Sequence, residues 1–121
     1  MIKKPEISGF LFCHTITLDV NNASRYYITM IESFKCALTK AFFQGQRIAK
    51  FVNIERVAMR KLQMIHAAVN LSFLRIPPQN RLEALKGNRL GQHSIRINDQ
   101  WRICFKFIDG NAHDVEIVDY H

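Results

Sequence analysis

The chain has 121 residues, of which 48% are hydrophobic and 22% charged, and its formal net charge is +7. This length suits one domain whose apolar core needs no disulfide or metal to hold it together. The three cysteines show no paired spacing and the five histidines are scattered, so the sequence predicts free thiols in a reducing compartment, no metal site and no cofactor. No apolar run approaches the roughly 18 residues of a membrane span, so we expect a cytoplasmic protein that makes no contact with a membrane.

The positive charge is concentrated in the middle of the chain. Residues 30–81 contain nine basic and two acidic residues, whereas residues 82–121 contain five basic and six acidic residues. Clustered Lys and Arg side chains attract the phosphates of nucleic acids. A solvated helical face gives the same pattern, so charge alone leaves both interpretations open.

The first 29 residues differ in character from the rest. A short apolar stretch follows two lysines there, but Pro5 interrupts it and it is too short for a signal peptide. Met30 opens a second plausible beginning, and residues 31–34 alternate as an edge strand would. We therefore expect residues 1–29 to be a poorly ordered extension or an artefact of start-codon choice, and residues 30–121 to form the domain.

Two helices are predicted in the first half of this domain. One covers residues 36–44, with Gly45 as its C-terminal stop. The next has Asn53 as its cap and Glu55 in its first turn. Its apolar stripe repeats at helical spacing and comprises Ile54, Val57, Ala58, Leu62, Ile65 and Val69. Pro77 then ends helical structure.

After the prolines the apolar residues alternate instead of repeating at helical spacing. A short strand is predicted within residues 82–85, and longer strands over residues 92–97, 101–107 and 112–120. Asp109-Gly110-Asn111 is typical of a hairpin turn. Helices followed by an antiparallel meander predict an α+β domain.

The pairing of the strands follows from the need to bury apolar residues on one face. A shift by one residue would turn every side chain to the opposite face. The sequence therefore predicts Ile95 opposite Ile103, Ile103 opposite Ile117, and Phe105 opposite Val115.

Charged residues occupy the other face of the predicted sheet. The same pairing places Arg96 beside Arg102, with Tyr120 diagonally across from Arg102 and with Lys106 facing Asp114. Two arginines directly opposite each other destabilise a sheet by about a few tenths to 1 kcal/mol, and an anion between them would reverse that penalty. We therefore expect Lys106 to be paired and the two arginines to be free to bind phosphate.

Three stretches in the second half of the chain resemble a known family. They are PPQNRLEALKGNR (residues 77–89), GQHSIRINDQWRICF (residues 91–105) and DVEIVDYH (residues 114–121). Together with residues 30–34 they are similar to the HigB toxins of the RelE superfamily, and the likeness covers about residues 30–121. The resemblance implies a small RelE-like α+β fold, in which N-terminal helices pack on a curled antiparallel sheet.

The resemblance also implies a function. Such a protein is the toxin of a type II toxin-antitoxin system, also described as a plasmid maintenance system killer protein. It would be a ribosome-dependent endoribonuclease that cleaves translated mRNA without a metal and so inhibits translation. Its partners would be the ribosome, mRNA and a cognate HigA-type antitoxin, and the complex with the antitoxin would bind operator DNA.

RNA cleavage without a metal requires three kinds of group. A base takes the proton of the ribose 2′-hydroxyl, cations stabilise the phosphate, and an acid protonates the leaving 5′-oxygen. The implied catalytic residues include Lys86 and Arg102 as cations, and Tyr120 and His121, of which the histidine transfers a proton. Some relatives have a histidine at the position of Glu83, so the base is open between Glu83 and His121.

Further basic residues are expected to bind RNA by its phosphates, which positions RNA without specifying its sequence. Near the sheet these residues are Arg81, Arg89 and Arg96. In the helical half, where ribosomal RNA would be contacted, they are Lys50, Arg56, Arg60 and Lys61.

Two other functions fit part of the sequence. The ParE group of the same superfamily inhibits DNA gyrase, but the terminal Tyr120-His121 pair and the face with Lys86, Arg96 and Arg102 argue against that target. A non-catalytic RNA-binding module is the third hypothesis, and it applies if residues 1–29 block the site.

Overall fold

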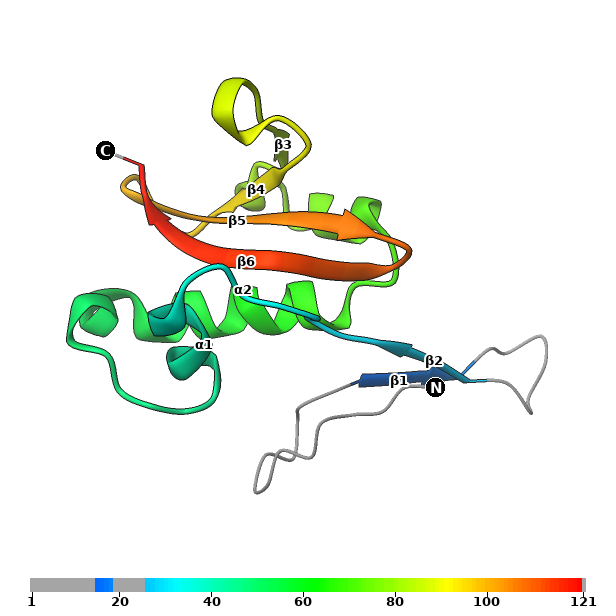
Figure 1. Ribbon diagram of the computed structural model, residues 1–121, viewed down its shortest axis with the longest axis horizontal. Coiled ribbons are helices and arrows are strands. Elements are labelled where there is room, and N and C mark those ends of the chain that lie inside the picture. The colour runs from blue at the N-terminus through cyan, green and yellow to red at the C-terminus, as the bar shows by residue number, and fades with distance from the viewer. Residues whose placement is uncertain (1–14, 19–25, 121) are drawn as a thin grey trace.

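The computed structural model describes residues 15–18 and 26–120, and its main body is a helical layer packed against a four-stranded sheet (Figure 1). The main elements are α1 (Ala37–Phe43), α2 (Glu55–Ala67), β3 (Glu83–Ala84), β4 (His93–Arg96), β5 (Trp101–Ile108) and β6 (Asn111–Asp119). The strands lie in the order β3-β4-β5-β6, each antiparallel to the next. Both helices lie on one side of the sheet, and the connection from β3 to β4 extends away from the other side (Figure 1). The predicted α+β meander is therefore confirmed.

Short segments connect or precede these elements. Four 3-10 helices lie within the described residues: η1 (Ala49–Ile54), η2 (Leu71–Arg75), η3 (Pro78–Asn80) and η4 (Gly87–Arg89). Strands β1 (Thr15–Leu18) and β2 (Tyr26–Thr29) pair antiparallel within the first 29 residues, a hairpin that the sequence did not predict. The other residues of that segment lie outside the described part of the chain, and its status as an extension stays a prediction.

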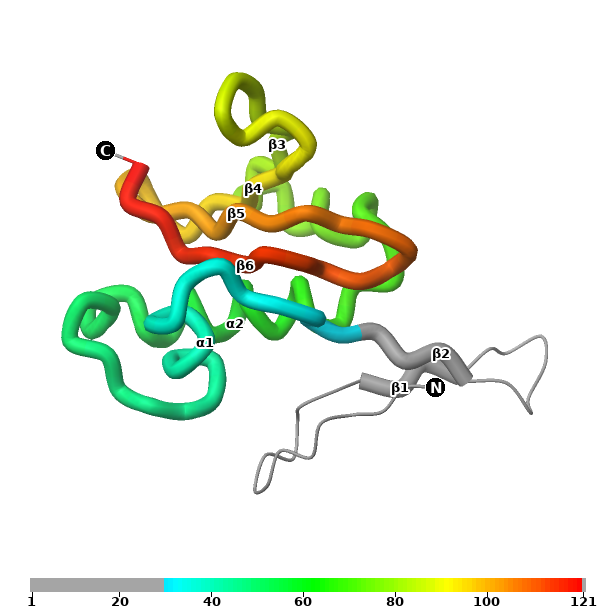
Figure 2. Tube along the Cα trace, viewed as in Figure 1, coloured from blue at the N-terminus to red at the C-terminus, as the bar shows by residue number. Residues whose placement is uncertain are grey.

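The segment that follows Met30, which was predicted as an edge strand, runs alongside β6. It forms no continuous strand, but Ile31 bridges to Ala112 and Phe34 bridges to Val115, both in parallel. The Glu32 amide donates to the Ala112 carbonyl at 2.7 Å. Figure 2 shows this segment beside β6 along much of the strand's length. The start of the domain therefore lies along the outer edge of the sheet, beside β6.

The two helices keep their predicted positions but differ in how they begin and end. Gly45 follows α1 with a φ of +103°, a left-handed conformation that glycine adopts without a steric penalty, so the predicted stop is confirmed. The predicted cap Asn53 is wrong, because it lies within η1 and the residue that precedes α2 is Ile54, which makes no side-chain cap. Val69 lies beyond the end of α2, so the stripe extends past the helix that carries it.

The core lies between α2 and the sheet. Ala58, Leu62 and Ile65 on α2 are at most 1% exposed, as are Ile95 and Ile103 on the facing strands. Burying a Leu or Ile side chain contributes roughly 1.5–3 kcal/mol. The helical stripe and the alternating strands therefore meet as the sequence predicted.

The sheet follows the predicted pairing except beyond Cys104 in β5. There Lys106 lies opposite His113 and not opposite Asp114, although its Nζ forms the predicted ion pair with the Asp114 carboxylate at 3.4 Å. Ile103 lies opposite both Ile95 and Ile117, as expected. A register shift between Cys104 and Lys106 interrupts the pairing of β5 with β6, so the predicted pairing of Phe105 with Val115 is wrong. Asp114, in the same stretch, has a φ of +55°. An extra residue in one strand causes such a β-bulge and increases the local twist.

Candidate active site

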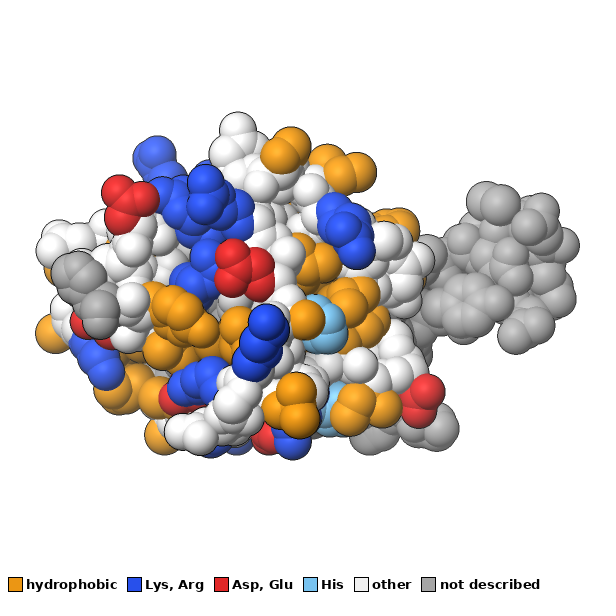
Figure 3. All heavy atoms as spheres, turned by 90° about the horizontal axis from the view of Figure 1, so that it is seen from above, with side chains coloured by type: hydrophobic (Ala, Val, Ile, Leu, Met, Phe, Trp, Pro, Cys, Tyr) orange, Lys and Arg blue, Asp and Glu red, His pale blue; other side chains and the backbone are white. Residues whose placement is uncertain are grey.

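The face of the sheet opposite the helices carries two rows of side chains. One row runs Glu83, Ser94, Cys104 and Glu116 across the four strands. The next row contains Arg96, Arg102 and Val118. The predicted placement of the two arginines side by side is confirmed. Viewed from above, Lys and Arg side chains gather on the surface, with acidic side chains among them (Figure 3).

Arg102 is the best-held side chain of this face. It is only 8% exposed. Its Nε donates to Ser94 Oγ at 2.8 Å, and its Nη2 donates to the Arg81 carbonyl at 2.7 Å. The Glu83 carboxylate lies 3.8 Å from the same Nη2, and the guanidinium carbon lies 5.8 Å from the centre of the Tyr120 ring. Three predicted catalytic residues, Glu83, Arg102 and Tyr120, therefore meet here.

Arg96 has a different environment from its neighbour. Its Nη2 forms an ion pair with Asp99, which lies in the hairpin loop three residues later. The expectation that Arg96 and Arg102 are a free pair is therefore wrong, because Arg96 binds a carboxylate and Arg102 binds a hydroxyl and a carbonyl. The Nη1 of Arg102 has no hydrogen-bond partner within the described residues, so that nitrogen is available to a ligand.

The end of β6 brings Tyr120 to this place. Its backbone amide donates to the Gln100 carbonyl at 2.6 Å, which ties the end of the chain to the β4–β5 loop. Asp119, one residue earlier, pairs in register with Trp101 and accepts from Gln100 Nε2 at 3.0 Å. The Tyr120 side chain is 43% exposed, so its ring is open to solvent. His121 lies outside the described residues.

The remaining basic residues near the sheet are Lys86 and Arg89, in the loop between β3 and β4, and Arg81, which precedes β3. Lys86 is exposed and has no ion-pair partner among the described residues, so its charge is available. Arg89 instead bridges two partners, with its Nη1 3.3 Å from Glu116 Oε1 and 3.0 Å from Gln92 Oε1. Arg89 therefore fastens this loop to β6. The Arg81 side chain is exposed, and only its carbonyl reaches Arg102.

The basic residues of the helical half divide into an exposed group and a buried one. Lys50, Arg56 and Arg60 are exposed. Lys61 was expected with them but is 5% exposed, and its Nζ donates to the side chain of Asn80. Burial, and then the charges of Arg60 and Arg96, lower the pKa of Lys61 below its usual value. Lys61 is therefore not available for an RNA contact.

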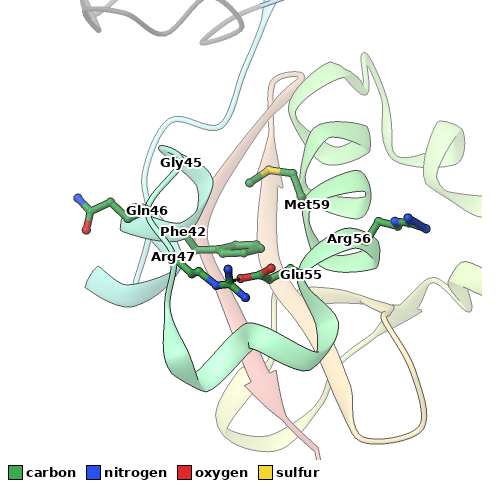
Figure 4. Close-up of a pocket in the computed structure, with 7 residues that line it drawn as sticks. All are labelled: Phe42, Gly45, Gln46, Arg47, Glu55, Arg56 and Met59. Carbon is green, nitrogen blue, oxygen red and sulfur yellow. Dashed lines mark ion pairs between the residues drawn. The ribbon is translucent and has the colours of Figure 1, made fainter.

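Arg56 also lines a pocket of about 380 Å³ between α1 and α2 (Figure 4). Phe42 and Met59 supply the apolar part of its wall. An ion pair between Arg47 Nε and Glu55 Oε2 at 3.2 Å crosses its edge, as the dashed line in Figure 4 shows. The pocket lies on the helical side and is separate from the sheet face with Arg102.

Two residues that were not among the predicted site residues hold others in place. Ser94 accepts from Arg102 Nε, and Asn80 accepts from Lys61 Nζ. Alternation placed Ser94 on the site face, but nothing in the sequence shows that its hydroxyl holds Arg102. His93, its neighbour in the chain, lies opposite Phe105 with ring centres 6.4 Å apart, so it belongs to the other face of the sheet and not to the site.

Within the described ranges, 15–18 and 26–120, no cluster of three His, Cys, Asp or Glu side chains is arranged to hold a metal ion. None of the helices in that part of the chain has the length and apolarity to cross a membrane.

Comparison with known proteins assigns the chain to a family. A family model described as RelE-like toxin of type II toxin-antitoxin system HigB matches residues 32–121. The chain belongs to the HigB-like toxin family. Toxin HigB-1 of Vibrio cholerae serotype O1 is 40% identical over 85 residues, which cover 69% of this chain and 90% of that protein. Endoribonuclease HigB of Proteus vulgaris is 36% identical over 95 residues, which cover 76% of this chain and 100% of that protein.

Family membership confirms the predicted HigB-type toxin of a type II toxin-antitoxin system. A toxin of this type has an antitoxin partner. The matched region begins two residues after Met30 and continues to the last residue of the chain.

Proposed function

We propose that this HigB-family toxin is a ribosome-dependent endoribonuclease that cleaves mRNA during translation without a metal ion. The observation that carries the proposal is the arrangement around Arg102, where a fixed guanidinium lies beside the Glu83 carboxylate and the Tyr120 ring. The relative from Proteus vulgaris is named as an endoribonuclease, and the match covers the whole length of that relative.

The chemistry begins with the ribose 2′-oxygen, which attacks the adjacent phosphorus as Glu83 takes its proton. Arg102 binds the phosphate through Nη1, which makes no hydrogen bond within the described residues, and Lys86 adds a second positive charge as negative charge develops on the oxygens. The bond from phosphorus to the 5′-oxygen then breaks, and His121 gives that oxygen a proton. The products are a 2′,3′-cyclic phosphate and a 5′-hydroxyl end.

Glu83 is the base in this scheme and His121 the acid. The Glu83 carboxylate lies 3.8 Å from Arg102 Nη2, and this closeness to the proposed phosphate ligand supports its role as the base for the neighbouring 2′-hydroxyl. Tyr120 is 43% exposed and its ring lies beside Arg102. In this scheme the ring stacks against a base of the message.

The exposed basic residues of the helical half contact ribosomal RNA. These residues, Lys50, Arg56 and Arg60, do not belong to the sheet face that carries Arg102. They therefore bind ribosomal RNA while Arg102 binds the mRNA. Contacts of this kind depend strongly on salt because phosphate binding releases counterions. Replacing Arg56 and Arg60 by alanine should weaken co-sedimentation with ribosomes and flatten its salt dependence, and unchanged affinity would contradict this contact.

The proposal includes the partners and the compartment of the toxin. A cognate HigA-type antitoxin inhibits it, and the complex of the two binds operator DNA. Ribosomes and mRNA place its action in the cytoplasm.

Primer extension on a message under translation tests the activity. The wild-type toxin should produce cuts only when ribosomes translate the message, and Arg102→Ala should abolish them. Arg75→Ala, which removes an exposed arginine at the end of η2, is the matched control and should cut like the wild type. Absence of ribosome-dependent cuts with the wild type would overturn the proposal, and DNA damage without mRNA cuts would indicate a gyrase inhibitor.

A further inference from the structure

Arg102 is held more firmly than an arginine that only awaits a ligand. An arginine side chain has several rotatable bonds, and its freedom is worth roughly 2 kcal/mol. Here two of its three nitrogens are occupied, Nε by Ser94 Oγ at 2.8 Å and Nη2 by the Arg81 carbonyl at 2.7 Å. Ser94 is completely buried, so no water competes for its hydroxyl. These two contacts fix the plane of the guanidinium before any RNA arrives.

The Arg81 carbonyl is itself held in place by its chain neighbour. Arg81 has a left-handed backbone, with φ 48° and ψ 57°, at the end of η3. The preceding residue, Asn80, is completely buried, and its Nδ2 donates to the Leu74 carbonyl at 3.0 Å. Because the backbone turns sharply at Arg81, a shift of Asn80 would redirect the carbonyl that Arg102 uses.

Lys61 on α2 completes this chain of contacts. Its Nζ donates to Asn80 Oδ1. No carboxylate among the described residues lies within ion-pair distance of Lys61, so its ammonium group is buried without a counter-charge. A buried unpaired charge costs stability that an apolar residue would not. Stability therefore does not explain Lys61, whereas the orientation of Asn80 does.

We propose that Ser94, Asn80 and Lys61 are positioning residues that hold Arg102 in the orientation needed to bind the scissile phosphate. The inference rests on the proposed function, because it assigns Arg102 to a phosphodiester. Ser94 acts directly on the guanidinium, and Lys61 acts through Asn80 and the Arg81 carbonyl. A misplacement of about 1 Å in such a group lowers the rate by up to about a hundredfold.

Two variants separate positioning from general stability. Ser94→Ala removes the hydroxyl that accepts from Nε, and Lys61→Met keeps the length of the side chain without its donor. Each is made in the wild type and in Arg102→Lys, which retains a charge but has no Nε. Ser72→Ala and Lys40→Met change exposed residues of the same types and serve as controls.

Single-turnover cleavage on ribosomes that hold one message gives the maximal rate and the half-saturating toxin concentration. Ser94→Ala and Lys61→Met should lower the maximal rate about ten- to hundredfold and change half-saturation less than about twofold, while the controls cut normally. In the Arg102→Lys background the same changes should have less than about a twofold effect, since the group they position is gone.

Three outcomes would overturn the inference. They are full activity of Ser94→Ala and Lys61→Met, equal losses in both backgrounds, and a loss that thermal unfolding attributes to an unfolded fraction in both variants. Failure of the proposed function gives a different result, because the wild type itself would then produce no ribosome-dependent cuts. If Lys61→Met does not fold, Ser94→Ala alone decides the direct contact.

Discussion

Replacing Glu83 by glutamine tests the assignment of the base. The amide has nearly the same shape as the carboxylate but cannot accept the proton of a 2′-hydroxyl. General base catalysis contributes about 10² to 10⁴ in rate. Glu83→Gln should therefore lower the maximal rate of ribosome-dependent cleavage by at least about a hundredfold.

The structure limits every other effect of this change to a much smaller size. The Glu83 carboxylate lies 3.8 Å from Arg102 Nη2, and its side chain is 54% exposed. An ion pair so open to solvent is worth about 0.2–1 kcal/mol. Its loss changes folding or phosphate affinity by roughly fivefold at most, since about 1.4 kcal/mol corresponds to a factor of ten. A hundredfold loss of rate would therefore have to come from the chemistry.

The assay is single-turnover cleavage of a message on ribosomes, together with co-sedimentation to measure ribosome affinity. Asp99→Asn is the matched control, because Asp99 also pairs with an arginine of the sheet face, Arg96, and is almost fully exposed. The control should cut within about threefold of the wild type. If Glu83→Gln cuts equally well, Glu83 is only a partner of Arg102 and the base must be sought elsewhere.

Three further predictions concern the core, the cysteines and the partly buried His93. Leu62→Ala should lower the free energy of unfolding, measured by urea denaturation, by about 2.7–5 kcal/mol, because Leu62 is completely buried. A loss no larger than that of Leu38→Ala, at an exposed position, would contradict the core assignment. Burial raises the pKa of Cys104. The pKa of Cys36 is lowered, because burial raises it less than the hydrogen bonds from Thr39 and Leu38 lower it. Peptide mapping after iodoacetamide treatment of the native protein should therefore find Cys36 modified well before Cys104, and equal rates would refute the difference. Burial also lowers the pKa of His93, so the unfolded chain binds this proton more readily and stability should fall as pH decreases through about 6.5. His93→Gln should lose less thermal stability than the wild type between about pH 7.5 and pH 5.5, and an equal loss would show that other groups cause the change.

The sequence predicted the sheet well because its pattern is local and repetitive. Alternation over β4 and β5 placed Ile95 opposite Ile103, since only one register buries both side chains. The Asp109-Gly110 turn was also predictable, because both residues adopt positive φ, 52° and 82°, which such a hairpin requires. The bulge after Cys104 leaves only a short trace in the sequence of β6, where two polar residues, His113 and Asp114, separate the buried Ala112 and Val115 and so break the alternation at that point.

The helical half was harder to predict because charge and burial diverge there. Lys61 lies next to the exposed Arg60 in sequence, and a lysine is almost never fully buried without a partner. Its partner, Asn80, is 19 residues away and follows two prolines. A contact of that sequence separation depends on how η3 packs against α2, which helical periodicity does not specify.

Arg96 and Arg102 differ because of what lies beside each of them in space. Arg96 ends β4, so the next residues form the hairpin loop and Asp99 reaches it from three residues away. Arg102 lies between Arg96 and Val118 in the same row, where Ser94 and the Arg81 carbonyl replace water around it. Their side chains are accordingly 31% and 10% exposed. A phosphate at this face would find the Arg102 guanidinium already oriented, whereas it would have to displace Asp99 from Arg96. The two arginines occupy equivalent positions in the sequence pattern but differ as phosphate ligands.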